Sequence, residues 1–176
     1  LTLDDGQGGT VSQAVTITIT GSNDAPVIAA GVEAGAVAEL ADNAPGEGVL
    51  VHSTSDSFNF SDLDLSDEHA VSVTAAGDDY LGELSAEVSD AATGDGSGEV
   101  TWSFEVSDSA IEHLGAGDSL TQTYTLAVDD GNGGTATQDV TVTITGQNDA
   151  PVIVEDDGAG QVFVDGSRRD SGQIVP

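Results

Sequence analysis

The chain contains one stretch twice, and this duplication limits its organisation more than any other feature of the sequence. Residues 4–28 read DDGQGGTVSQAVTITITGSNDAPVI and residues 129–153 read DDGNGGTATQDVTVTITGQNDAPVI, so matching positions lie 125 residues apart without a gap. Across residues 1–28 and 126–153, 20 of 28 positions are identical. A period close to the size of one domain is too long for a solenoid and typical of domains joined end to end. The sequence therefore predicts a segment of a tandem array.

The period divides the chain into one complete module and two fragments. We expect residues 1–24 to hold the C-terminal strands of a preceding repeat, residues 25–149 to form a complete sandwich module, and residues 150–176 to begin a following repeat. Pro26 restricts the residue before it to extended backbone, so residues 23–26 predict a short stiff linker. Neighbouring repeats are thus the expected partners. The fragments are expected either to be disordered or to complete each other by strand addition, within or between chains.

The composition excludes several classes of partner. The chain has 32 acidic and 2 basic residues, a formal net charge of −30 at pH 7, and both basic residues, Arg168 and Arg169, lie in the C-terminal fragment. Nucleic acids and anionic membrane surfaces need basic patches, so neither is an expected partner, whereas cations are. There is no cysteine for a disulfide or a thiolate metal site, and no apolar run is long enough to insert into a membrane.

Apolar residues alternate with polar ones along many short segments, which is the pattern of half-buried β-strands. The clearest case is residues 100–106, where Trp102 is the expected core anchor. Val15, Ile17 and Ile19 alternate with threonines and predict a half-buried strand in the N-terminal fragment. Turn residues separate the segments, and no long helical period occurs. These features predict an all-β fold, an antiparallel Greek-key β-sandwich.

Threonine rows at residues 16–20 and 141–145 allow another interpretation, a flat face that binds a ligand or ice. Such a face should extend over several neighbouring strands, and we expect no such rows on the other strands. Threonines on the solvent face of an antiparallel strand explain the rows more simply.

Acidic and amide side chains are concentrated at the ends of the expected strands. Asp62 and Asp64 are one residue apart, which places both carboxylates on the same side of an extended segment. Asp129 precedes a glycine-rich turn, and Asn23 and Asp24 lie in the linker. Calcium takes six to eight oxygen ligands from groups of this kind, and three such loops meeting at a junction would supply them. The alternative is an acidic surface that only keeps the chain soluble.

The run TYTLAVDDGNGGTATQDVTVTITGQNDAPVI, residues 123–153, resembles the C-terminal half of a VCBS repeat, a module of large bacterial RTX-type adhesins. It is also similar to cadherin repeats. The cadherin motif AxDxG is matched by Ala127, Asp129 and Gly131, and the motif DxD by Asp62 and Asp64. The motif DxNDN is matched in part by Asn23-Asp24 and Asn148-Asp149, and the motif VxENxP in part by Val37, Glu39 and Pro45. The LDRE motif of cadherins is absent before Tyr124.

This resemblance implies a cadherin-like or Ig-like sandwich with calcium at the seams between modules. The ligands that it implies at the first junction are Asn23, Asp24, Asp62, Asp64 and Asp129. Those that it implies at the second junction are Glu39, Asn148 and Asp149, with Glu33 as an alternative to Glu39. The function implied is that of a calcium-stiffened tandem extender module of a secreted or cell-surface bacterial adhesin, a structural spacer in cell adhesion.

The sequence also bears on two other functional classes. A β-sandwich module of the same surface protein could instead bind a glycan or a partner protein. Catalysis is not expected, because the three histidines are scattered and no Ser-His-Asp or HExxH pattern occurs. Paired acids could serve a glycosidase, but aromatic residues to line a sugar cleft make up only 4% of the chain.

Overall fold

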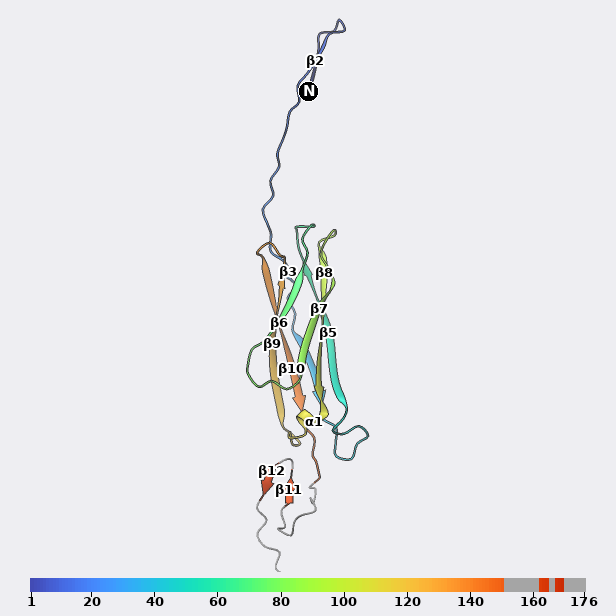
Figure 1. Cartoon of the computed structure of the whole chain (residues 1–176), viewed down its shortest axis with the longest axis vertical. Coiled ribbons are helices and arrows are strands. Elements are labelled where there is room, and N and C mark those ends of the chain that lie inside the picture. Colours follow the sequence, from blue (N-terminus) through green and yellow to red (C-terminus); the bar gives the residue numbers. More distant parts are fainter. Residues whose placement is uncertain (151–161, 165–166, 170–176) are drawn as a thin grey trace, which may run out of the picture.

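Two four-stranded sheets pack face to face between residues 27 and 145 and form a β-sandwich (Figure 1). The structure is a computed structural model that describes residues 1–150, 162–164 and 167–169. The first sheet has the order β4–β10–β9–β6 and the second has the order β3–β5–β8–β7. The elements of the sandwich are β3 (Val27–Ile28), β4 (Glu33–Ala38), β5 (Val51–Ser61), β6 (Ala70–Ala75), β7 (Glu83–Asp90), β8 (Ser97–Ser107), α1 (Asp108–Ile111), β9 (Ser119–Asp129) and β10 (Thr135–Thr145).

Strand pairs in the sandwich are antiparallel except for β4 with β10, which run parallel. β3 and β4 follow each other along the chain but belong to opposite sheets, so the chain crosses between the sheets at residues 29–32. The parallel register pairs Glu33 with Val140 and Ala38 with Thr145, which brings the segment after β4 beside the segment after β10. The predicted all-β sandwich is confirmed.

The core lies between the sheets and follows the alternation of the sequence. Trp102 is 2% exposed, which confirms it as a core residue, and its indole Nε1 donates a hydrogen bond to Glu33 Oε2 at 3.3 Å. Burial of one large apolar side chain stabilises a fold by about 1.5–3 kcal/mol. The three strands that contribute most are β8 (Val100, Trp102, Phe104, Val106), β9 (Tyr124, Leu126, Val128) and β10 (Val140, Val142, Ile144).

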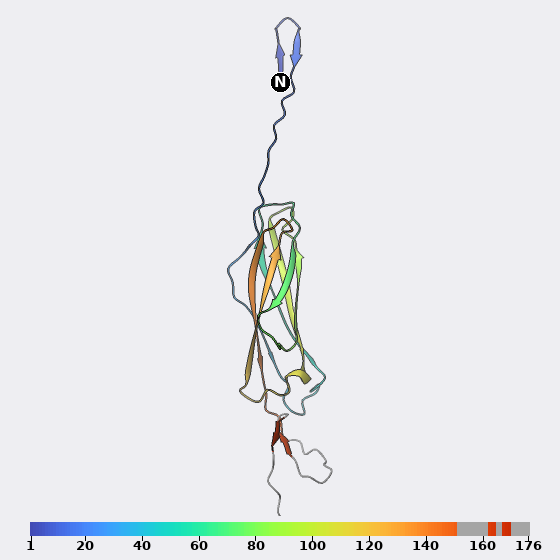
Figure 2. The same ribbon diagram turned by 60° about the vertical axis from the view of Figure 1, so that its left-hand side comes forward.

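The N-terminal segment lies outside the sandwich (Figures 1 and 2). Val15, Ile17 and Ile19 are 66%, 80% and 90% exposed and belong to no strand, so the half-buried strand predicted for them is wrong. A strand needs hydrogen-bonding neighbours. The second copy of this segment, β10, lies between β4 and β9, whereas the first copy has no corresponding neighbours among the described residues. The segment before it is a hairpin of β1 (Thr2–Asp4) and β2 (Thr10–Ser12).

The threonine row of β10 faces solvent and has a second row beside it. Thr141 lies opposite Thr123 of β9, and Thr143 lies opposite Thr121. The expectation that no other strand carries such a row is therefore wrong. The reason is that β9, like β10, alternates threonines with core residues over much of its length.

Two further strands follow the sandwich, β11 (Val162–Val164) and β12 (Ser167–Arg169), and they pair antiparallel. The rest of the predicted start of a following repeat lies outside the described residues, and the proposed module boundaries stay predictions. In the part of the chain that the structure describes, no helix has the length and hydropathy needed to cross a bilayer, and α1 has four residues.

Candidate metal sites at the two ends of the sandwich

Three buried carboxylates meet where the linker enters the sandwich, at the upper end in Figure 1. Asp62 directly follows β5, Asp67 lies in the loop between β5 and β6, and Asp130 directly follows β9. Each offers one carboxylate oxygen within 4.8 Å of those of the other two. The three residues are 4%, 7% and 1% exposed, in chain order. We call this group the upper site.

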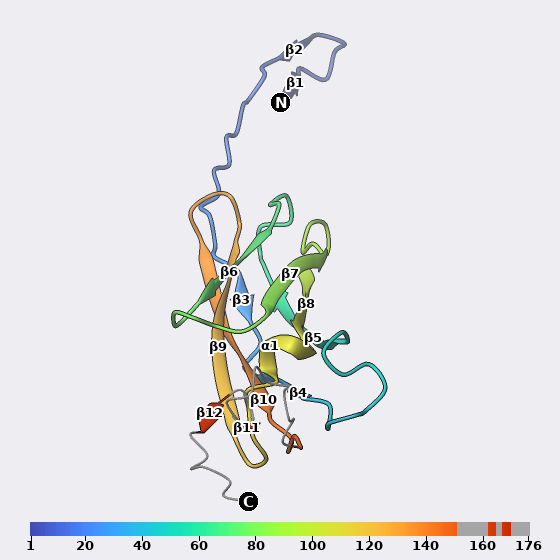
Figure 3. The ribbon, with the colours of Figure 1, turned by 60° about the horizontal axis from the view of Figure 1, so that its bottom comes forward.

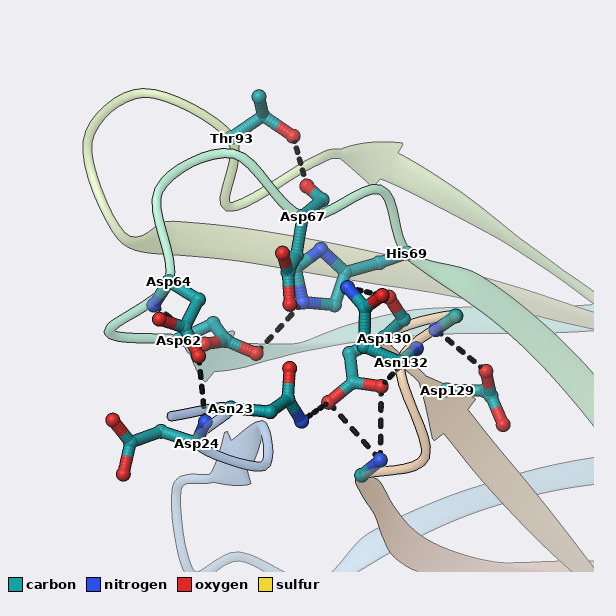
Figure 4. Close-up of polar contacts among 12 residues, drawn as sticks. Asn23, Asp24, Asp62, Asp64, Asp67, His69, Thr93, Asp129, Asp130 and Asn132 are labelled. Carbon is teal, nitrogen blue, oxygen red and sulfur yellow. Dashed lines mark hydrogen bonds and ion pairs between the residues drawn. The ribbon is translucent and has the colours of Figure 1, made fainter. Parts of the chain in front are cut away.

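Hydrogen bonds fix both carboxylate oxygens of Asp62. The Asp64 backbone N–H donates to Asp62 Oδ1 at 2.9 Å, and His69 Nε2 donates to Asp62 Oδ2 at 3.1 Å (Figure 4). The His69 side chain is fully buried and packs against Phe60, with the ring centroids 4.8 Å apart. The loop after β5 therefore holds this carboxylate in one orientation.

The turn between β9 and β10 fixes Asp130. Its Oδ1 accepts hydrogen bonds from the backbone N–H groups of Asn132 at 2.8 Å and Gly134 at 2.9 Å, and its Oδ2 accepts one from Asn23 Nδ2 at 2.9 Å. The hydrogen bond from Asn23 is the main cause of a lowered pKa for Asp130, which burial opposes and the backbone donors reinforce. A Cβ at Gly134 would collide with Asp130 Oδ2, so the turn needs glycine there. Asp130 is thus held ionised and aimed inward.

Asp67 carries the observation that points to a cation. Its Oδ2 is buried and has no hydrogen-bond partner among the described residues, although its carboxylate lies beside those of Asp62 and Asp130. Burying an unpaired charge is costly, and two unit charges 4 Å apart repel by about 4 kcal/mol at an effective dielectric near 20. A hard cation takes oxygen ligands of this kind and would remove both penalties. The residues present therefore fit calcium.

Two of the predicted ligands, Asp24 and Asp64, contact each other, and neither of their carboxylates belongs to the upper site. The Asp24 backbone N–H donates to Asp64 Oδ2 at 2.6 Å (Figure 4). Asn23 reaches the upper site through Asp130, and Asp62 belongs to it. The linker is therefore held by two different loops, and the ligand roles of Asn23, Asp24, Asp62 and Asp64 stay predictions.

Asp129 is also a predicted ligand, but the structure places it outside the upper site. It is exposed, and its Oδ1 accepts a hydrogen bond from the Gly131 backbone N–H at 2.7 Å. Consecutive strand residues point to opposite faces, so the inward position after buried Val128 falls to Asp130. Continuing the alternation past Val128 would have identified Asp130 from the sequence, whereas no comparable signal marks Asp67. The ligand role of Asp129 also stays a prediction.

A second acidic group, the lower site, lies at the opposite end of β10 and consists of Glu39, Glu112 and Asp149, whose carboxylate oxygens lie within 4.8 Å of one another. Figure 3 shows this end, with α1 at the end of β8. Glu112 is the residue that directly follows α1 in the chain. Glu39 is 3% exposed, and the Gln147 backbone N–H donates to its Oε2 at 2.6 Å. The cadherin-like motifs indicate Glu39 and Asp149, whereas no motif in the sequence indicates Glu112.

The remaining candidates for the lower end lie elsewhere. Glu33 accepts a hydrogen bond from Trp102, so of the two alternatives it is Glu39 that joins the lower site. Asn148 is exposed, and its Nδ2 donates to the carbonyl oxygen of Asp149 at 3.3 Å. Its ligand role stays a prediction, as do those of Glu39 and Asp149.

Charge is distributed unequally between Asp108 and Glu112, one helical turn apart. Asp108 is fully buried, and burial opposes its ionisation. Its carboxylate accepts hydrogen bonds from His52 Nε2 at 2.6 Å and from the backbone N–H groups of Gly48 at 2.7 Å and Leu40 at 3.0 Å. These hydrogen bonds outweigh burial and keep the pKa of Asp108 below its usual range. Burial, and then the hydrogen bond and charge of Asp108, raise the pKa of Glu112 to about 7. The lower site therefore holds a carboxyl group that titrates near neutrality.

No known protein family matches the sequence, and no curated protein of similar sequence is found. Several solved structures are similar at low TM-scores. Cadherin-like domains 1 to 4 of zebrafish RET have a TM-score of 0.37 and 12% identity, over 71% of this chain and 28% of that one. Domains 4 and 5 of the S-layer protein SbsC have 0.35 and 13%, over 79% and 54%. AggA, the major subunit of aggregative adherence fimbriae type I from Escherichia coli, has 0.35 and 12%, over 73% and 99%. Similarity at this level does not extend to function.

Proposed function

We propose that this chain is a calcium-stiffened spacer from the tandem repeats of a secreted or cell-surface bacterial adhesin, of the VCBS or RTX type that its sequence resembles. One observation carries the proposal. The upper site gathers three buried carboxylates at the point where the linker from the preceding repeat enters the sandwich, and one of them, Asp67, has a buried oxygen without a hydrogen-bond partner among the described residues. A cation is the partner that this arrangement favours.

Calcium supplies positive charge at the upper site, and the residues of the chain determine what that charge does. Asp62 and Asp130 are held in place by their own loops, so the site does not have to be assembled from disordered segments. Asn23 connects the linker to Asp130, and Asp24 connects it to Asp64. A cation shared by the three carboxylates ties the loop after β5 to the turn after β9, the two segments that hold the linker, and so limits bending between modules.

The lower site would do the same at the junction with a following repeat. Glu39, Glu112 and Asp149 come from three segments that end at the lower face of the sandwich, and Asp149 belongs to the second copy of the linker motif. A module with a cation site at each end transmits stiffness along an array. The proposed partners are therefore calcium ions and the neighbouring repeats of the same chain, and the proposed role is structural rather than enzymatic.

Calorimetric titration of the whole chain with calcium, paired with thermal unfolding in calcium and in chelator, tests this function. We expect saturable binding and a higher melting temperature in calcium. Magnesium, which demands a smaller octahedral site, should raise the melting temperature less. Equal melting temperatures in calcium and chelator, with no heat of binding, would contradict the proposal.

Glycan binding is the second candidate, and one surface feature favours it. The outer face of the second sheet has a hollow of about 390 Å³ whose lining includes the side chains of Ser55, Ser85, Glu87, Thr101 and Ser103. Hydroxyl and carboxylate groups can hydrogen-bond sugar hydroxyls. Retention of the chain on a neutral glycan surface would support this function if a Ser103→Leu variant were not retained. If the chain itself were not retained, the spacer role would remain as the single candidate function.

A further inference from the structure

We propose that Asn132 deamidates spontaneously and that its conversion to isoaspartate weakens the upper site. The reaction follows from the Asn132-Gly133 pair, the one Asn–Gly sequence in the chain. The pair lies in the turn between β9 and β10, in which backbone N–H groups hold Asp130. The modification itself is independent of the proposed function, whereas its effect on calcium binding rests on that function.

The reaction consumes one water molecule and releases one ammonia molecule. The backbone nitrogen of Gly133 attacks the side-chain carbonyl carbon of Asn132 and loses its proton, and the amide nitrogen takes up a proton and leaves as ammonia. Water then opens the five-membered succinimide ring. Opening at the side-chain carbonyl gives aspartate, and opening at the backbone carbonyl gives isoaspartate, in which the main chain runs through the former side chain.

The structure leaves the reacting pair accessible. Asn132 and Gly133 are exposed, and apart from its chain neighbours nothing lies within 4 Å of the position that a Cβ on Gly133 would occupy. A side chain on the residue after an asparagine shields the attacking nitrogen, and glycine also reaches backbone conformations that other residues rarely adopt. The four other asparagines are each followed by a residue with a side chain: Asn23, Asn43, Asn59 and Asn148.

The hydrogen bonds of the turn oppose the reaction. Asn132 Nδ2 donates to the carbonyl oxygen of Asp130 at 3.4 Å, and the Asn132 backbone N–H donates to Asp130 Oδ1 at 2.8 Å (Figure 4). Ring closure needs the side chain to leave its contact and the backbone to rotate, so the turn has to open locally. A cation bound to Asp130 favours the closed turn and should therefore slow the reaction.

Isoaspartate changes the turn more than aspartate does. It adds one atom to the main chain between the Asn132 and Gly134 nitrogens, whose N–H groups donate to the same Asp130 oxygen at 2.8 and 2.9 Å. The added atom displaces one donor relative to the other, so the Asp130 carboxylate loses part of what fixes its orientation. Aspartate at position 132 adds the same charge and leaves the main chain unchanged.

The first copy of the turn supplies a matched control. Gln7 occupies the position of Asn132, and its backbone N–H donates to Asp5 Oδ1 at 2.8 Å, as that of Asn132 does to Asp130. Glutamine would have to close a six-membered ring, which forms far more slowly than the five-membered one. Asn132→Gln should therefore preserve the turn and block the modification.

The test ages the whole chain at mildly alkaline pH, in chelator and in calcium, and follows ammonia release and residue-resolved peptide mapping. We expect Asn132 to convert at least about tenfold faster than any other asparagine, because glycine follows it. Conversion should be slower in calcium than in chelator. Asn132→Gln should release little ammonia over the same period and should bind calcium as the unaged chain does.

Calorimetric titration then measures what the modification does to the upper site. The isoaspartate form, separated from the aged chain by ion exchange, should bind calcium at least about tenfold more weakly than the unaged chain. Asn132→Asp carries the same charge on an unchanged main chain and should bind at least as tightly as the unaged chain. An equal loss in Asn132→Asp would assign the effect to charge and overturn the proposed role of the main chain.

The remaining outcomes separate the modification from the function. Conversion of Asn132 no faster than that of the other asparagines overturns the modification. Fast conversion without loss of affinity, in a chain that binds calcium, overturns its effect on the upper site and leaves the proposed function standing. Fast conversion in a chain that binds no calcium supports the modification and overturns the proposed function. Fast conversion that calcium slows, with loss of affinity confined to the isoaspartate form, supports the whole inference.

Discussion

Asp5 and Asp130 occupy the same position in two copies of one turn, and the two turns have the same hydrogen bonds. Asp5 Oδ1 accepts from the backbone N–H groups two and four residues further on, at 2.8 and 2.9 Å, and Asp130 Oδ1 does so at the same distances. In both turns these backbone donors lower the pKa of the aspartate. Asp5 is exposed, whereas Asp130 is 1% exposed. The turn is therefore formed by its own sequence, and the burial of Asp130 in the upper site depends on the loops around the turn.

Removing the charge of Asp67 should raise the stability of the chain in chelator and reduce the stabilisation that calcium adds. An Asp67→Asn variant loses one carboxylate from a buried group of three, so we expect it to be about 1 kcal/mol or more stable than wild type in chelator. In calcium it should show a smaller rise in melting temperature than wild type. Thermal unfolding in both conditions measures this, with the exposed Asp78→Asn as control. A loss of stability in chelator equal to that in calcium would argue against a cation at this position.

Asp129 and Asp130 should differ in their effect on calcium affinity. Asp130→Asn replaces a buried carboxylate that three donor groups hold in place. We expect this change to lower the calcium affinity at least about tenfold. Asp129→Asn changes an exposed residue and should cost much less. Calorimetric titration of the two variants measures the difference. If Asp129→Asn were the more damaging change, the ligand that the sequence motif indicates would be the correct one.

The two copies of the threonine-rich segment offer a matched test of the fold. Ile144 is fully buried in β10, and its counterpart Ile19 is 90% exposed. Ile144→Ala should lower the free energy of unfolding by about 2–5 kcal/mol, as large-to-small changes in a core do, while Ile19→Ala should leave it nearly unchanged. Chemical denaturation of both variants measures this. A comparable loss in Ile19→Ala would mean that the N-terminal segment packs against the folded chain.

The raised pKa of Glu112 predicts a pH dependence of stability in chelator. Its pKa is about 7 in the fold against an ordinary value of 4.5, so the folded state binds the proton more tightly than the unfolded state does. The resulting stabilisation is fully present below pH 4.5, declines as the pH rises, and is lost above pH 7. Glu112→Gln imitates the protonated form and should flatten this decline. Denaturation at several pH values between 5 and 8 measures it, with the exposed Glu105→Gln as control; a slope that Glu112→Gln leaves intact would assign the effect to another group.

The fold could be predicted from the sequence because alternation along β8, β9 and β10 directly reports which residues are buried. The same pattern at Val15, Ile17 and Ile19 was misleading, since alternation indicates that a segment can form a strand and not that its neighbours are present. The parallel pairing of β4 with β10 could not be predicted either, because no local feature of residues 33–38 specifies a partner strand about a hundred residues away.

For the candidate sites, the sequence indicates which loops come together but not which of their residues face inward. The acidic loop, the linker and the turn after β9 do meet at the upper end, as their spacing suggested. Which carboxylates turn inward depends on the packing of each loop, so the sequence motifs did not indicate Asp67 and Asp130. Glu112 was missed because its nearness to Glu39 and Asp149 depends on the way α1 folds back over the end of the sandwich.

Small-angle X-ray scattering of the whole chain, recorded in calcium and again after adding chelator, tests the central claim most directly. If calcium binds the carboxylates at the junction and stiffens the linker, the chain in calcium should show a well-defined extended shape. Chelator should then broaden its distribution of dimensions, and restored calcium should reverse the change. The same distribution in both conditions, from a sample that binds calcium by calorimetry, would show that calcium does not control stiffness and would contradict the account.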